Sequence, residues 1–88
     1  MTSGYAVRIS ARAERDLLRL RERIASACLE FIFGPLADRP LRVGGPLSGQ
    51  LAGLRSARRG SYRIIYGTDE DLKRIDIIHI DHRGDVYR

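Results

Sequence analysis

One stretch of this chain concentrates positive charge on a predicted strand. From Leu54 to Tyr66 the sequence reads Leu-Arg-Ser-Ala-Arg-Arg-Gly-Ser-Tyr-Arg-Ile-Ile-Tyr, and its four arginines are Arg55, Arg58, Arg59 and Arg63. Arg63 has β-forming residues on both sides, so its side chain should project from one fixed face of a sheet. Guanidinium groups held rigidly in this way are suited to binding phosphate. The alternative interpretation is a solvated strand face with ordinary surface charge.

A second group of reactive side chains lies at the C-terminal end of the sequence. The last seven residues read His-Arg-Gly-Asp-Val-Tyr-Arg and include His82, Arg83, Asp85 and Tyr87. A histidine has an ordinary pKa of about 6.5, which makes it the best intrinsic acid or base near neutral pH. Three structural alternatives stay open: Tyr87 packs the tail onto the sheet, His82 has no role, or Asp85 pairs with Arg83 and reduces its reach.

Length and charge limit the kinds of site that this chain can build. With 88 residues it is expected to form a single domain, 1–88, whose small core leaves function to the surface or to a shallow groove. The net charge is +5, and Lys73 is the only lysine among the 16 basic residues. This arginine bias favours phosphate or carboxylate partners, although a GC-rich genome would produce the same bias without functional meaning.

The cysteine, histidine and hydropathy patterns argue against disulfides, metal sites and membrane spans. A single cysteine, Cys28, excludes an internal disulfide and a multi-cysteine zinc site, and its apolar helical surroundings predict a packed core thiol. His79 and His82 are three apart on a predicted strand, so they should face opposite ways and cannot chelate one ion. His79 is interpreted as a structural histidine. We expect no metal, no cofactor and no membrane span, and a cytoplasmic location.

The first half of the chain is predicted to be mainly helical. Residues 5–9 alternate as a strand, and Ser10 is placed to cap a helix over 11–20. A bend at 21–23 separates it from a second helix that starts at Ile24 and should end at Gly34-Pro35. The region 36–49 contains two prolines and a Gly-Gly pair, so it is predicted to be a connector with room for one helical turn after Pro35.

The second half is predicted to consist of strands. They cover 51–57, 62–68 and 74–81, with turns at 58–61 and 69–72. The last strand has isoleucines on both faces, which is typical of a strand with neighbours on both sides. The resulting fold class is α+β with the order β-α-α-β-β-β, in which a helical hairpin packs on one face of a small antiparallel sheet and leaves the other face free.

Two motifs in this order resemble the RelE branch of the RelE/ParE toxin superfamily. One is Tyr62-Arg63-Ile64-Ile65-Tyr66 after the arginine-rich hairpin, and the other is His82-Arg83-Gly84-Asp85-Val86-Tyr87. The resemblance covers almost the whole chain. It implies the toxin of a type II toxin–antitoxin pair, a ribosome-dependent endoribonuclease that cuts messenger RNA in the ribosomal A site without a metal. It also implies a RelB-like antitoxin that wraps the toxin and neutralises it.

The resemblance also implies roles for individual residues. Arg63 and Arg83 match the two arginines that stabilise the phosphate, Tyr87 matches a tyrosine used for positioning or proton transfer, and His82 stands where many relatives carry a histidine. Arg58 matches a basic position on the preceding strand, and with Arg55 and Arg59 it completes the expected RNA-binding set. Some members carry two lysines on that strand, where this chain has Leu54 and Ser56, so His82 is the expected proton-transfer group.

Two other functions share some of these features. A ParE-type inhibitor of DNA gyrase has the same fold but needs no convergent phosphate-handling groups, and Arg63, His82, Arg83 and Tyr87 argue against it. A non-catalytic RNA-binding module is the third choice. The exposed sheet lacks the interleaved aromatic side chains on which single-strand binders stack bases.

Overall fold

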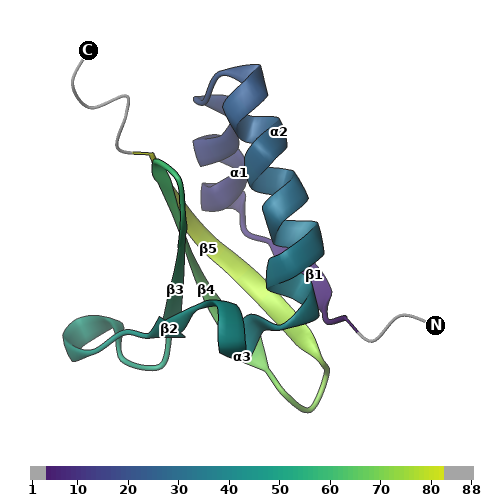
Figure 1. Cartoon of the computed structure of the whole chain (residues 1–88). Coiled ribbons are helices and arrows are strands. Elements are labelled where there is room, and N and C mark those ends of the chain that lie inside the picture. The colour runs from purple at the N-terminus through teal and green to yellow at the C-terminus, as the bar shows by residue number, and fades with distance from the viewer. Residues whose placement is uncertain (1–3, 83–88) are drawn as a thin grey trace.

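A computed structural model describes residues 4–82 and places two helices on one side of a five-stranded sheet (Figure 1). The elements are β1 (Ala6–Ile9), α1 (Ala11–Leu18), α2 (Glu22–Phe31), a π-helical segment η1 (Ile32–Leu36), α3 (Pro40–Val43), β2 (Gly45–Pro46), a 3-10 turn η2 (Gly49–Leu51), β3 (Arg55–Arg59), β4 (Tyr62–Asp69) and β5 (Arg74–His82). The predicted α+β class and the order of the main elements are confirmed.

The sheet differs from the prediction in one pairing. Its strand order is β1-β5-β4-β3-β2, and β1 runs parallel to β5 while the other pairs are antiparallel. The sheet is therefore mixed and not purely antiparallel. The two helices separate β1 from the later strands and return the chain, so that β5 can lie parallel beside β1. The expectation that the last strand has neighbours on both sides is confirmed.

The start of α1 is fixed both by its own cap and by β5. Ser10 Oγ accepts a hydrogen bond from Ala13 N at 3.0 Å, as the sequence predicts for an N-cap. The same hydroxyl donates to Ile78 O of β5 at 3.1 Å. The helix begins where predicted and ends two residues earlier, at Leu18.

The second helix does not end at Gly34-Pro35, so that prediction is wrong. The chain continues through Pro35 as η1, in which Ala37 N donates to Ile32 O five residues back. Proline has no N–H to donate to the preceding turn. A π-helical turn shifts the hydrogen-bond pattern, so the helix can continue past Pro35 without that bond. Ile32 and Leu36 are fully buried on this segment, and that burial outweighs the local helix-breaking tendency. No helix in residues 4–82 is long and apolar enough to cross a bilayer.

The connector contains more structure than the sequence predicts. The helical turn expected after Pro35 is present as α3, but a two-residue strand, β2, pairs with β3 and was not predicted. The predicted strand over 51–57 begins only at Arg55, because η2 and the positive φ angles of Gly49 and Gly53 turn the chain first.

The hydrophobic core lies between the sheet and the helices. Tyr62, Ile64 and Tyr66 of β4 and Ile75, Ile77 and Ile80 of β5 are buried against residues of α1, α2 and η1. Cys28 is fully buried among them, and burial raises the pKa of its thiol to about 11. The predicted core thiol is confirmed.

A bulge interrupts the alternation of β5. Tyr66 pairs with Ile77 and Ile65 pairs with His79, so Ile78 is the extra residue between them. The bulge puts two residues, Ile78 and His79, between Ile77 and Ile80. Both isoleucines can therefore point into the core although they are three positions apart.

Candidate active site

The free face of the sheet carries a row of charged side chains from three adjacent strands. Arg58 of β3 pairs directly with Arg63 of β4, and Arg63 pairs directly with Asp81 of β5. Residues opposite one another in a sheet project from the same face, and Arg63 alternates with the buried Tyr62 and Ile64. The row therefore lies on the face away from the helices.

The row borders a shallow hollow at the β3–β4 hairpin. The hollow has a volume of about 60 Å³ and is lined by Arg58, Gly60, Ser61, Tyr62, Arg63 and Asp81. With Arg58 and Arg63 in its lining, the hollow suits an anionic group such as a phosphate.

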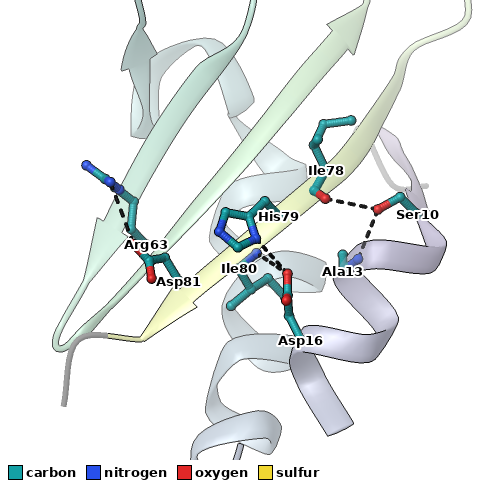
Figure 2. Close-up of polar contacts among 8 residues, drawn as sticks. All are labelled: Ser10, Ala13, Asp16, Arg63, Ile78, His79, Ile80 and Asp81. Carbon is teal, nitrogen blue, oxygen red and sulfur yellow. Dashed lines mark hydrogen bonds and ion pairs between the residues drawn. The ribbon is translucent and has the colours of Figure 1, made fainter. Parts of the chain in front are cut away.

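The charges around the hollow favour an anion. Two guanidinium groups that face each other across a strand pair repel one another. The carboxylate of Asp81 offsets part of this repulsion, with Asp81 Oδ2 3.7 Å from Arg63 Nη2 (Figure 2). Both side chains are substantially exposed, 38% for Arg63 and 44% for Asp81, so this ion pair is weak. An incoming phosphate could therefore bind both arginines at low cost.

His82 projects from the opposite face to Arg63. It pairs with Tyr62, whose side chain enters the core, and Arg63 is the next residue along β4. Its Nε2 lies 2.8 Å from the hydroxyl of Ser61, one of the residues that line the hollow. The structure thus links His82 to the hollow through Ser61 and does not place its ring beside Arg63. The predicted opposite orientation of His79 and His82 agrees with this register.

Two other predicted phosphate ligands have contacts on the helix side of the sheet. Arg59 pairs with Tyr62, and its guanidinium lies 5.0 Å from the centre of the Phe31 ring. Arg55 donates hydrogen bonds of 2.9 Å to Leu41 O and to Gly44 O, which hold the end of α3 against β3. These contacts give Arg55 a structural role.

Arg83 and Tyr87 lie outside the described residues. Of the seven predicted site residues, the structure brings Arg58 and Arg63 together and turns Arg55 and Arg59 to the other face. His82 contacts Ser61, which lines the same hollow as the two arginines.

Sequence reasoning missed the pair formed by His79 and Asp16. Asp16 Oδ2 lies 2.7 Å from His79 Nδ1 and accepts a hydrogen bond from Ile80 N at 3.0 Å (Figure 2). Partial burial favours a higher pKa for Asp16, but the hydrogen bonds from Ile80 and His79, with the charges of His79 and Arg12, outweigh it and lower the pKa. Asp16 and His79 are 63 residues apart in sequence, so no local pattern links them and the sequence held no signal for this contact.

Residues 4–82 contain no group of three or more histidine, cysteine or acidic side chains that could hold a metal ion. The charged row on the free face consists of two arginines, Arg58 and Arg63, and one carboxylate, Asp81.

The fold is that of small toxins of toxin–antitoxin systems. Residues 7–87 match the family described as the ParE toxin of type II toxin–antitoxin systems, parDE, and the chain belongs to that family. The resemblance to the RelE/ParE superfamily is confirmed.

Relatives named RelE and RelG are similar over nearly the whole chain. Toxin RelE of Mycobacterium tuberculosis (strain ATCC 25618 / H37Rv) is 55% identical over 84 residues, which cover 96% of this chain and 87% of the relative. Toxin RelG of the same strain is 50% identical over 84 residues, covering 96% and 97%. The crystal structure of the toxin–antitoxin complex RelBE2 from M. tuberculosis matches with a TM-score of 0.90 and 48% identity, covering 92% of this chain and all of that one.

Proposed function

We propose that this protein is a ribosome-dependent endoribonuclease that cuts messenger RNA in the ribosomal A site and so inhibits translation. The observation that carries the proposal is the directly opposed pair Arg58 and Arg63 beside a shallow hollow on the free face of the sheet. The names of the RelE and RelG relatives support it.

The geometry suits stabilisation of a reacting phosphodiester. When a 2′-hydroxyl attacks the neighbouring phosphorus, negative charge grows on the phosphoryl oxygens, and fixed cations lower that barrier. Arg63 is held on a central strand between β3 and β5, so its backbone position changes little when RNA binds. Arg58 would share the charge from the neighbouring strand.

The remaining catalytic candidates come from the resemblance. Arg83 would add a second phosphate contact and Tyr87 would position the substrate or transfer a proton. His82 would exchange protons through Ser61, whose hydroxyl lies between its ring and the hollow. Arg59 is exposed at the hairpin and would contact the RNA backbone farther from the reacting phosphate. We propose that the reaction needs no metal or cofactor.

We also propose that a RelB-like antitoxin binds and neutralises the protein. The structural relative is a complex of this kind. The chain exposes several large apolar side chains, among them Phe33, Leu41 and Val43 with exposures of 58%, 49% and 40%. A short amphipathic partner with acidic residues would cover apolar side chains such as these and complement the net charge of +5.

The proposal can be tested with purified ribosomes programmed with a defined messenger RNA. We expect the wild-type protein to give codon-phased cuts, mapped by primer extension, and Arg63→Ala to lower the cleavage rate by on the order of 10²-fold. Arg15→Ala is the matched control, because it removes an exposed arginine from α1, outside the charged row. If both variants lost the same fraction of the cleavage rate, the loss would reflect the lower positive charge in general and not a specific role of Arg63.

The second candidate is inhibition of DNA gyrase, which the ParE name of the family favours. A gyrase inhibitor would leave ribosome-bound messenger RNA intact and would cause DNA breaks in cells. The same Arg63→Ala variant would then keep full toxicity if Arg63 has no role in binding gyrase. Measuring both products in one induced culture separates the two functions.

A further inference from the structure

We infer that His79, oriented by Asp16, is the group that takes the proton from the 2′-hydroxyl in this cleavage, and that Asp16 is its positioning residue. The inference rests on the proposed function and names a further catalytic residue for it. It replaces the interpretation of His79 as purely structural.

The bulge of β5 places His79 on the same face as Arg63. His79 pairs with Ile65, which is two residues from Arg63 on β4, and Asp81 is two residues from His79 on β5. His79 is therefore the diagonal cross-strand neighbour of Arg63, and such neighbours lie about 7–8 Å apart, within reach of long and aromatic side chains. A phosphodiester held by Arg63 could place its 2′-hydroxyl next to the imidazole. His82, in contrast, pairs with Tyr62 and projects from the opposite face, where it contacts Ser61.

Asp16 fixes the imidazole from the edge of the sheet. β1 pairs with β5 only as far as Ile77, so no strand within residues 4–82 lies beside the next part of this β5 edge. Side chains of α1 and its cap take that place: Ser10 binds Ile78 O, and Asp16 binds both Ile80 N and His79 Nδ1 (Figure 2). The carboxylate is anchored by the backbone bond, and its side chain is only 13% exposed. It can therefore hold the ring in one orientation.

This contact leaves the second ring nitrogen available. With the Nδ1 proton donated to Asp16, a neutral His79 has its lone pair on Nε2. Within residues 4–82, Nε2 makes no hydrogen bond, and the side chain is 25% exposed. In Figure 2 this nitrogen lies on the side of the ring away from Asp16, which in that view is the side of Arg63 and Asp81. A base held by a carboxylate with a free, accessible nitrogen is a common arrangement for proton transfer.

The charged groups around the ring come from three elements. Asp16 and Arg12 belong to α1, Arg63 to β4 and Asp81 to β5. A phosphate bound at Arg63 would add negative charge beside these groups at the stage when His79 must accept a proton.

The step conserves atoms and charge. His79 Nε2 takes the proton from the 2′-hydroxyl while the 2′-oxygen forms a bond to phosphorus. The bond from phosphorus to the 5′-oxygen breaks, which leaves a 2′,3′-cyclic phosphate. The 5′-oxygen takes a proton from water, and the imidazolium returns its proton to the hydroxide so formed.

The test compares single-turnover cleavage on programmed ribosomes across pH 5 to 8 for the wild type, His79→Asn, Asp16→Asn and His82→Ala. His79→Asn keeps an N–H near the position of Nδ1 for Asp16 but has no base. We expect it to cut on the order of 10²-fold more slowly, with unchanged ribosome affinity and a flattened pH profile. Asp16→Asn should slow cleavage less and also alter the pH profile. His82→Ala removes the proton-exchanging group proposed above, so it should slow cleavage but leave a pH dependence that His79→Asn lacks.

The inference is overturned if His79→Asn cuts at the wild-type rate with the wild-type pH profile. A slow His82→Ala beside an unimpaired His79→Asn would assign the proton transfer to the His82–Ser61 route instead. Failure of the proposed function gives a different result, because the wild type itself would then leave ribosome-bound messenger RNA uncut at every pH.

A measurement on the wild-type protein keeps the inference testable if a variant does not fold. Long-range ¹⁵N–¹H NMR distinguishes the two neutral tautomers of His79. We expect the proton on Nδ1. A neutral ring protonated on Nε2 could not accept the 2′-hydroxyl proton and would overturn the inference.

Discussion

At the scale of single residues, the sequence predicted the direction of Arg63 better than that of either histidine. Arg63 could be placed because it alternates with the buried Tyr62 and Ile64. Arg58 was expected in the turn over 58–61, but it lies on β3 opposite Arg63. His79 and His82 could not be placed, since the bulge at Ile78 changes which face each residue of β5 occupies. A bulge of one residue leaves no clear mark in a strand rich in isoleucine, so the contact with Asp16 became visible only in three dimensions.

Asp81 is the residue whose removal should strengthen anion binding. Its carboxylate is 3.7 Å from Arg63 and repels a phosphate in the same hollow. Exposed ion pairs are worth about 0.2–1 kcal/mol, so we expect Asp81→Asn to tighten binding of a short, uncleavable RNA by about 2- to 5-fold at low salt. Fluorescence anisotropy at two salt concentrations measures this change.

Asp76→Asn is the control for Asp81→Asn, because Asp76 lies on the same strand and its partner is Arg74, at 3.0 Å, not Arg63. It should change the affinity less than Asp81→Asn does. Weaker binding by Asp81→Asn would mean that the carboxylate positions Arg63 and does not compete with the ligand.

At the scale of elements, the strands of the second half were predictable and the segment between η1 and β3 was not. Alternation defined β4 and β5, but β2 has only two residues, and proline and glycine in its sequence predict a loop. This segment depends on contacts that are distant in sequence: Arg55 binds Leu41 O and Gly44 O, and Tyr66 donates to Pro40 O at 2.5 Å. Such contacts cannot be read from local patterns.

Gly44 is the position where this segment tolerates no side chain. Its φ of −111° is open to any residue, but a Cβ there would overlap the Tyr66 hydroxyl and lie 2.7 Å from Ser56 O. Overpacking of this kind costs about 1–3 kcal/mol, so we expect Gly44→Ala to lower the free energy of unfolding by that amount in urea titrations. Gly45→Ala is the matched control, because a Cβ at Gly45 meets no atom within 4 Å. Equal stability of the two variants would contradict the packing argument.

At the scale of the whole molecule, Asp16 contributes both to the candidate site and to the attachment of α1 to the sheet. Its carboxylate accepts from the β5 backbone and contacts His79, 63 residues away in sequence. The β-α-α-β-β-β order could be predicted because each element has its own local pattern. The parallel pairing of β1 with β5, which brings α1 to this edge, depends on contacts between the two ends of the described chain.

This double role makes a prediction about stability and pH. The pKa of Asp16 is lowered in the folded protein from its ordinary value of 3.8, so its ionised form is favoured by folding. The stabilisation is therefore fully present above pH 3.8 and is lost as pH falls through the lower pKa of the folded state. We expect Asp16→Asn to be less stable than the wild type in urea unfolding at pH 7 and at pH 5, and the difference to shrink at pH 3 and below. Glu14→Gln, an exposed change on the same helix, should show no such convergence. A stability difference that stays constant down to pH 2 would mean that the shape of the Asp16 side chain, and not its charge, holds α1 to β5.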